Sequence, residues 1–231
     1  MNAVVTGATK GIGKAIALKL AQHGYQLAVC ARTESDLVAL AKELEPFGQQ
    51  VLTVVADFSK KEEVIAFYEK VAANFETIDV LVNNAGIFLT GELLDETDEV
   101  FEKQQQANVN AAYYLCKHFG RRMRDQHSGH IFNICSIASK EIKANAGSYT
   151  VTKTSLLSLN DVLRKELSKY HVKVTAILPG STLTASWAGT TIEKEKFVQP
   201  EDIADTLYAI LKLSSGANVD EVIITPLNFN H

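Results

Sequence analysis

The sequence predicts an α/β fold: a single domain with a doubly wound parallel sheet of about seven strands and helices on both faces. Two features of the 231-residue chain carry this prediction. Short β-branched runs alternate with longer segments of helical spacing, the order that produces βαβ units and a parallel sheet. The short runs are apolar throughout, as expected of strands that helices cover on both faces. Ligands of such sheets bind beyond the carboxyl ends of the strands, so functional residues are sought there.

The expected elements follow one another without an intervening linker or repeat. The strands are expected at Ala3–Thr6, Gln26–Ala31, Val51–Ala56, Ile78–Val82, His130–Cys135, Val172–Leu178 and Val219–Thr225. The helices are expected at Lys14–His23, Glu34–Phe47, Lys61–Phe75, Asp98–Gln126, Ser148–Tyr170 and Pro200–Leu213. We therefore expect residues 1–231 to form one domain.

Composition excludes several classes of protein. A net charge of −4 argues against a protein that holds nucleic acid through a general basic field. No apolar run approaches the roughly 20 residues that cross a bilayer, and the first residues lack the layout of a signal peptide. The cysteines, Cys30, Cys116 and Cys135, are far apart and odd in number, which favours a reduced, cytoplasmic setting. No spacing of histidines and acids matches a metal site, so none is predicted.

A glycine-rich turn joins the first strand to the first helix. It reads Thr6-Gly7-Ala8-Thr9-Lys10-Gly11-Ile12-Gly13, a GxxxGxG relative of the dinucleotide fingerprint. Glycine lets the backbone turn sharply and approach a pyrophosphate, and the free N–H groups of the helix favour its charge. The alternative is a tight turn without a ligand, which the position of this motif in the first βα unit makes the weaker interpretation.

The end of the second strand indicates which dinucleotide is bound. Enzymes that use NAD place an acid there to hold the ribose hydroxyls, but the chain reads Val29-Cys30-Ala31-Arg32. Arg32 and Lys10 can instead bind a 2′-phosphate, which predicts NADP(H). The alternative is that both are solvated surface charges.

A tyrosine and a lysine near the start of a long helix point to proton transfer. Tyr149 and Lys153 are four residues apart and share a helical face, as do Tyr113/Lys117 and Tyr208/Lys212. Only the first pair has a serine, Ser136, thirteen residues upstream at the carboxyl end of a strand. Reduction of a carbonyl needs a proton donor for its oxygen, and an ammonium beside a tyrosine stabilises the phenolate that is left. A serine hydroxyl can donate a second hydrogen bond to the developing oxyanion.

The chain resembles the short-chain dehydrogenase/reductase family along almost its whole length. The matching elements, in order, are Thr6–Gly13, Asp57, Asn83-Asn84-Ala85-Gly86, Asn108, Ser136, Tyr149/Lys153 and Pro179-Gly180. The resemblance implies a Rossmann fold of the compact NADP(H)-dependent branch. The ending Val222–His231 lacks the glycine-rich tail of 3-oxoacyl-carrier-protein reductases, so the sequence is more similar to sepiapterin-reductase-like members.

The resemblance implies a role for each matching residue. Tyr149 would be the general acid or base, Lys153 would support it and hold the nicotinamide ribose, and Ser136 would position the carbonyl. Asn108, rather than its neighbour Asn110, would bend its helix and bind a water through its backbone. The remaining positions would bind the cofactor: Gly7, Thr9, Lys10, Gly11, Ile12, Gly13, Arg32, Asp57, Phe58, Asn83, Ala85, Gly86, Pro179, Gly180, Thr182 and Thr184.

The sequence then predicts an NADP(H)-dependent reductase of a ketone or aldehyde, or the reverse alcohol dehydrogenase. Reduction of a 3-oxoacyl carrier protein is one alternative, and a non-catalytic NADP(H) sensor is another. Residues 181–199 are expected to form a substrate lid, in which Trp187, Phe197 and Val198 wall the substrate pocket or pack on the body of the domain. Leucines over more than one face of Ser148–Tyr170 predict a homodimer or homotetramer; the alternative is that this helix is buried within one chain.

Overall fold

The sheet carries seven parallel strands in the order β3-β2-β1-β4-β5-β6-β7. A computed structural model describes residues 1–142 and 144–227 of the chain. The strands are β1 (Asn2–Thr6), β2 (Gln26–Ala31), β3 (Val51–Val55), β4 (Val80–Asn83), β5 (Gly129–Ile134), β6 (Val172–Pro179) and β7 (Glu221–Ile224). The predicted doubly wound α/β sheet is therefore confirmed.

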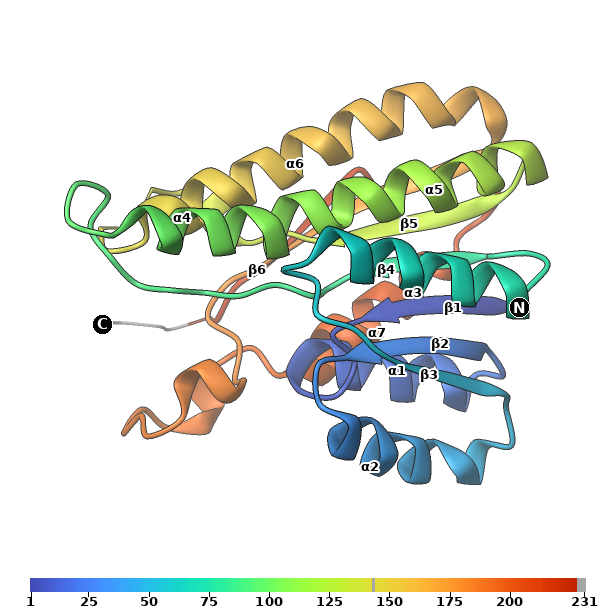
Figure 1. Cartoon of the computed structure of the whole chain (residues 1–231), viewed down its shortest axis with the longest axis horizontal. Helices are drawn as coiled ribbons and strands as arrows, with labels where there is room; N and C mark the ends of the chain where they lie inside the picture. Colours follow the sequence, from blue (N-terminus) through green and yellow to red (C-terminus); the bar gives the residue numbers. More distant parts are fainter. Residues whose placement is uncertain (143, 228–231) are drawn as a thin grey trace.

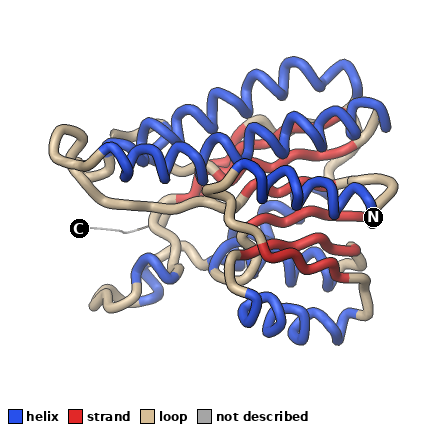
Figure 2. Tube along the Cα trace, viewed as in Figure 1, coloured by secondary structure: helices blue, strands red, loops and turns tan. Residues whose placement is uncertain are grey.

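Helices cover both faces of this sheet (Figures 1 and 2). One layer consists of α1 (Gly11–Gln22), α2 (Glu34–Leu44) and α7 (Pro200–Leu211). The other consists of α3 (Lys61–Asn74), α4 (Asp98–Gln105), α5 (Ala111–Gln126) and α6 (Gly147–Leu167). Within the described residues, no helix combines the length and apolarity needed to span a membrane.

Apolar clusters on both faces of the sheet hold the layers together. Leu20 and Leu27 belong to the core under α1 and α7, and both are fully buried. Phe67 and Phe119 belong to the core under α3 and α5, and are also fully buried. Burying each such side chain contributes about 1.5–3 kcal/mol, so both faces of the sheet are fixed firmly.

The long helix predicted at Asp98–Gln126 is interrupted. A π-helical turn at Gln106–Asn110 separates α4 from α5. Within this turn, the side chain of Asn108 bonds to the backbone N–H and C=O of Ile87, at 2.8 and 3.0 Å. Such single π turns recur at functional sites, because they redirect a side chain within an otherwise regular helix. The predicted helical segment therefore holds a π turn, and Asn108, which was expected to bend this helix, lies within that turn.

The last strand is shorter than predicted: β7 covers Glu221–Ile224 rather than Val219–Thr225.

The order of strands reverses at β1, which pairs with β2 on one side and β4 on the other. The carboxyl ends of β1 and β4 thus border the crevice where doubly wound sheets bind ligands. The glycine-rich turn and the Asn83–Gly86 segment both start at that crevice.

Candidate active site

The glycine-rich turn is fixed by hydrogen bonds to the residues that directly follow β4. Thr6 Oγ1 accepts the N–H groups of Asn84 and Ala85, both at 2.9 Å, and Asn84 Nδ2 donates to the carbonyl oxygens of Thr6 and Gly7. Gly7 has φ +62, which a glycine adopts without cost. A β-carbon at Gly13 would come within 2.3 Å of both Asn84 Nδ2 and Gly7 O. The turn therefore requires glycine at both positions.

The start of α1 has the properties of an anion site. Its N-cap, Lys10, makes no side-chain cap, and its first turn holds no acidic residue. The first N–H groups of the helix therefore point outward without a carboxylate or hydroxyl to bind them, which suits a phosphate. Thr9, Gly11 and Ile12 lie at this helix start.

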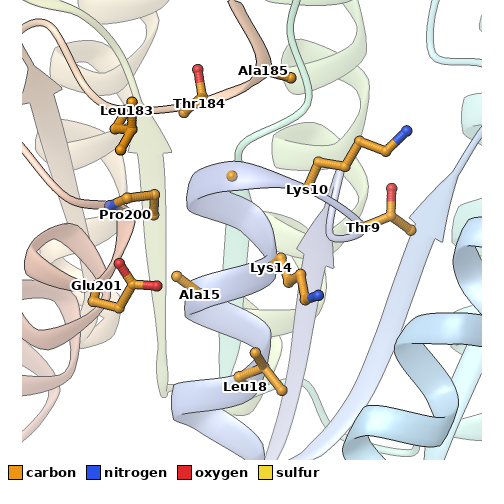
Figure 3. A pocket seen from close by; sticks show the side chains of 11 residues that line it. Thr9, Lys10, Lys14, Ala15, Leu18, Leu183, Thr184, Ala185, Pro200 and Glu201 are labelled. Atoms are coloured by element: carbon orange, nitrogen blue, oxygen red, sulfur yellow. The ribbon is translucent and has the colours of Figure 1, made fainter. Parts of the chain in front are cut away.

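A cavity of about 470 Å³ lies beside this helix start. Figure 3 shows Leu183, Thr184 and Ala185 facing the first turn of α1, with the Lys10 side chain beside that turn. A β-carbon at Gly11 would meet Cγ2 of Thr184 at 3.0 Å, so the lid segment rests directly on the glycine-rich turn. A pyrophosphate bound at this helix start would therefore contact both segments.

The two cations expected at a 2′-phosphate differ in their surroundings. Arg32 is exposed at the end of β2. Lys10 forms an ion pair with Asp36 of α2 at 2.8 Å, although its side chain stays 67% exposed. Lys10 was expected to be available to a ligand, and the structure shows that it already has an anionic partner. Sequence reasoning overlooked Asp36, which lies four residues beyond Arg32.

Asp57 and Phe58 follow β3 and have different roles. Burial raises the pKa of Asp57, but hydrogen bonds from the Ser59 N–H and hydroxyl, with Arg32 and Lys60 nearby, outweigh this and lower it overall. Asp57 is thus an ionised group close to Arg32. The Phe58 ring is buried against Phe67 at 5.6 Å, so its side chain belongs to the core and only its backbone can meet a cofactor.

Asn83 was expected to line the cofactor, but its side chain is turned into the sheet. Its Nδ2 donates to Asn133 Oδ1 at 2.8 Å, and Asn133 Nδ2 donates in turn to Asn160 Oδ1 of α6 at 3.0 Å. All three amides are buried. This chain joins β4, β5 and α6 behind the site, so the Asn83 side chain supports the site without facing it. Ala85 and the exposed Gly86 are the residues that border the crevice.

The predicted acid–base residues converge beyond β4 and β5. Lys153 is 5% exposed, and its Nζ lies 5.8 Å from the centre of the Tyr149 ring. The same Nζ donates to the carbonyl oxygen of Ile134 at 2.9 Å. A β-carbon at Gly86 would lie 2.9 Å from Asn108 Oδ1 and 3.6 Å from Lys153 Nζ. Because Gly86 has no side chain, the crevice extends up to the ammonium group of Lys153.

Ser136 is placed next to this pair by the short helix that follows it. The helix, η3 (Ile137–Ser139), begins where the Oγ of Ser136 accepts the N–H of Ala138 at 3.1 Å. Ser139 Oγ donates to the carbonyl oxygen of Lys153 at 3.0 Å, and the Thr154 hydroxyl donates to that of Ser139. The segment carrying Ser136 is therefore bound to the helical turn that carries Lys153.

The two other tyrosine–lysine pairs occupy surfaces without these companions. Lys117 Nζ lies 6.0 Å from the Tyr113 ring, which repeats the geometry of the candidate pair, but Tyr113 is 47% exposed on α5. Tyr208 stacks on His23 at 3.8 Å. Spacing alone would not separate these pairs from Tyr149/Lys153; burial and the neighbouring Asn108 and Ser136 do so.

Pro179 is the last residue of β6, and the segment after the strand begins at Gly180. Thr182 is buried and its hydroxyl donates to the carbonyl oxygen of Gly180 at 3.0 Å, whereas the Thr184 hydroxyl pairs with that of Ser186 at 2.7 Å. Phe197 and Val198 are each 5% exposed, and Val198 joins the core under α1. Of the two alternatives for the apolar lid residues, packing on the body of the domain is correct for Val198.

Besides Asp36, two further polar residues were not identified from the sequence. Gln104, fully buried in α4, accepts the N–H of Leu89 at 3.1 Å. Thr152 accepts a hydrogen bond from Asn108 Nδ2 at 3.1 Å and so connects the π turn with α6. Gln104 lies one helical turn before Asn108, and that spacing was a signal in the sequence.

Comparison with known proteins places the chain in a family. The sequence pattern of the family described as short chain dehydrogenase matches residues 1–195. An uncharacterized oxidoreductase from Staphylococcus saprophyticus is 36% identical over 226 residues, which cover 97% of each chain. An alcohol dehydrogenase from the archaeon Thermococcus sibiricus, solved with 5-hydroxy-NADP, superposes with a TM-score of 0.91 at 30% identity, covering 100% of this chain and 98% of that one.

A second solved structure has the same fold. L-sorbose reductase from Gluconobacter frateurii, in complex with NADPH and L-sorbose, has a TM-score of 0.89 at 28% identity over 97% of this chain and 95% of its own. The extent of these matches, together with the glycine-rich turn and the Tyr149/Lys153 pair, leads to one conclusion. The chain belongs to the short-chain dehydrogenase/reductase family of NAD(P)-dependent oxidoreductases.

Proposed function

We propose that this chain is an NADP(H)-dependent reductase of ketones or aldehydes, or catalyses the reverse oxidation of the alcohol. The observation that carries the proposal is the buried Lys153 ammonium, 5.8 Å from the centre of the Tyr149 ring and next to the crevice at Gly86. Burying an ammonium costs free energy, and proteins retain such costs chiefly at functional sites. Here it faces a phenol that can exchange a proton with a substrate.

Each residue has a defined task in this reaction. NADPH supplies a hydride to the carbonyl carbon when it is bound. Tyr149 gives its phenolic proton to the carbonyl oxygen, and the Lys153 ammonium stabilises the phenolate that remains. Ser136 Oγ accepts the N–H of Ala138, which leaves its own hydrogen free to donate to the same carbonyl oxygen. Asn108 holds the Ile87 backbone and thereby the wall beside Gly86.

Cofactor binding follows from the uncapped start of α1. The pyrophosphate would bind its N–H groups, and Arg32 would bind a 2′-phosphate by its planar fork. Lys10 would leave its ion pair with Asp36 and bind that phosphate instead. The bound 5-hydroxy-NADP and NADPH of the two solved relatives support the phosphorylated cofactor.

We also propose assembly into a homodimer or homotetramer. Val151 and Val162, both on α6, are 45% and 50% exposed, and Tyr113 on the adjacent α5 is 47% exposed. Apolar side chains left uncovered on neighbouring helices are typical of a surface that a second copy covers. Size-exclusion chromatography with light scattering on the intact chain and on Val162→Lys tests this: the variant should shift towards monomer.

The state of the three cysteines is relevant to the cellular compartment in which the protein works. Cys30, Cys116 and Cys135 are all unpaired and buried, and burial raises the pKa of each thiol to about 12. Such thiols do not form thiolates near neutral pH and are inert. They fit the proposed cytoplasmic setting, in which thiols stay reduced.

The decisive experiment measures NADPH consumption with a panel of carbonyl compounds, and repeats it with Tyr149→Phe. The panel holds an acetoacetyl thioester, a vicinal diketone, a pterin side-chain ketone and a simple aldehyde. Tyr149→Phe should lower turnover at least about a hundredfold, since it removes the proton donor. Tyr113→Phe is the matched control, because Tyr113 has the same lysine spacing on an exposed surface.

The panel also separates the alternatives. A preference for the acetoacetyl thioester would favour 3-oxoacyl reduction over general carbonyl reduction. Tight NADPH binding without turnover of any compound would contradict the reductase proposal and favour a cofactor sensor. Equal activity of Tyr149→Phe and the intact chain would show that Tyr149 is not the proton donor.

A further inference from the structure

We propose that Phe88 determines substrate choice, and that the site prefers carbonyl compounds with an aromatic or bulky apolar substituent. This inference rests on the proposed carbonyl reductase function. The Phe88 ring meets the Tyr149 ring edge-on, with centroids 4.8 Å apart and planes at 74°. Phe88 is still 47% exposed, so one side of its ring packs on the proton donor and another side remains open.

The direction of Phe88 is fixed by hydrogen bonds to its two neighbours. Ile87 exchanges two hydrogen bonds with the Asn108 amide, at 2.8 and 3.0 Å. On the other side, Leu89 donates its N–H to Gln104 at 3.1 Å. Asn108 and Gln104 are buried and lie one helical turn apart, so they hold the backbone on both sides of Phe88. The ring is therefore placed by the fold and does not depend on a flexible loop.

The remainder of this loop is bound to the first turn of α6, which carries Tyr149. Gly91 donates its N–H to the Asn145 carbonyl oxygen at 3.0 Å and accepts the N–H of Gly147. Ser148, which is fully buried, donates its hydroxyl to Glu96. Hydrogen bonds thus join residues 87–96 to the start of α6, and the two segments together form a wall beside Tyr149.

This wall exposes apolar side chains next to α6. Leu93 packs on Gly147, where an added β-carbon would meet its Cβ at 2.9 Å, and it is 58% exposed. With Phe88 it gives two exposed apolar side chains that lie against the first turn of α6. Exposed apolar groups gathered beside a reactive residue indicate a binding surface. An aromatic ring of the substrate could meet the open side of Phe88 in the offset or edge-on geometry that aromatic pairs favour.

The test compares two ketones whose reacting carbonyls are nearly identical: 4-phenylbutan-2-one and butan-2-one. We expect the intact chain to have a kcat/KM at least about tenfold higher for the phenyl compound. Phe88→Leu should lower that ratio at least about tenfold, and Phe88→Tyr should retain it because the ring is kept. The KM for NADPH should stay unchanged in both variants. Leu94→Ala, on the same loop and 94% exposed, is the matched control.

A second variant tests how Phe88 is positioned. Gln104→Leu keeps the buried volume but removes the acceptor for the Leu89 N–H. The backbone around Phe88 is then held on one side only, by the hydrogen bonds between Ile87 and Asn108. The ratio of the two kcat/KM values should fall in the same direction as in Phe88→Leu. General destabilisation would lower both values equally and leave the ratio unchanged.

Failure of this inference can be distinguished from failure of the proposed function. Turnover with an unaltered ratio in Phe88→Leu, or a preference of the intact chain for butan-2-one, overturns the role of Phe88 alone. If no carbonyl is reduced, calorimetric binding of 3-phenylpropanamide and propanamide to the NADP⁺-saturated chain replaces the kinetic test. Stronger binding of the phenyl amide that is lost in Phe88→Leu supports the role of Phe88; equal binding of both amides overturns it.

Discussion

Lys153 donates a hydrogen bond from its Nζ to the backbone carbonyl oxygen of Ile134, at 2.9 Å. Ile134 is the last residue of β5, so this bond joins α6 to the carboxyl end of a central strand. An ammonium has three donors, and this bond uses one of them. The other two remain for the phenol of Tyr149 and for a hydroxyl of a bound cofactor. The sheet thus fixes the direction of the ammonium before any ligand binds.

Lys153→Met is expected to separate activity from stability. The variant should lower kcat at least about a hundredfold, because the phenolate of Tyr149 loses its counter-charge. Its Tm should stay equal or rise, since burial of an ammonium with little compensation is costly and methionine fills a similar volume. Activity assays and thermal unfolding check both statements. Lys117→Met, from the exposed pair, should change neither; a large loss of Tm in Lys153→Met would contradict this account.

Asp36→Asn should strengthen NADPH binding. The change frees Lys10 from its ion pair at 2.8 Å, and exposed pairs of this kind are worth about 0.2–1 kcal/mol. The dissociation constant for NADPH should therefore fall up to about fivefold, with little change for NADH. Fluorescence titration measures both constants. Asp125→Asn, which frees Arg124 from an exposed pair at 2.9 Å near the C-terminus of α5, is the matched control.

Arg32→Ala tests whether Arg32 binds the 2′-phosphate of NADPH. Removal of a charge-assisted hydrogen bond costs about 1.5–3 kcal/mol, so NADPH binding should weaken roughly ten- to a hundredfold. NADH lacks the 2′-phosphate and should bind almost as before. An equal loss for both cofactors would show that Arg32 does not read the phosphate.

The asparagine chain behind the site is expected to contribute to stability. Asn133→Ala would leave Asn160 Oδ1 without its present partner in a buried setting, whereas Asn83 Nδ2 would keep its bond to Cys116 Sγ at 3.1 Å. One unsatisfied buried group costs about 1–3 kcal/mol, so the free energy of unfolding should fall by about that amount. Urea unfolding measures it. Asn74→Ala removes a bond to the Lys70 carbonyl oxygen on an exposed helix end and should cost under about 0.5 kcal/mol.

Much of this arrangement was predictable from the sequence, because it depends on local patterns. The seven strands follow from apolar runs, and the relation of Tyr149 to Lys153 follows from helical spacing. Side-chain direction was less predictable. Asn83 ends a strand, and a shift of one position decides whether its side chain faces the crevice or the interior of the sheet. Phe58 and the Lys10–Asp36 pair depend on how separate elements pack, which no local pattern specifies.

His130 makes stability depend on pH in the acid range. Burial, with a smaller effect from Lys173, lowers its pKa to about 3, against an ordinary value of 6.5. Thr175 donates its hydroxyl to the Val219 carbonyl oxygen, so it accepts from His130 Nε2 at 2.8 Å and fixes the neutral ring. The unfolded chain therefore binds a proton that the folded chain rejects. Stability is full above pH 6.5 and should fall by about 3 kcal/mol by pH 4. Urea unfolding of the intact chain and of His130→Gln at pH 7 and pH 4 tests this: the variant should lose less, and equal losses would exclude His130 as the cause.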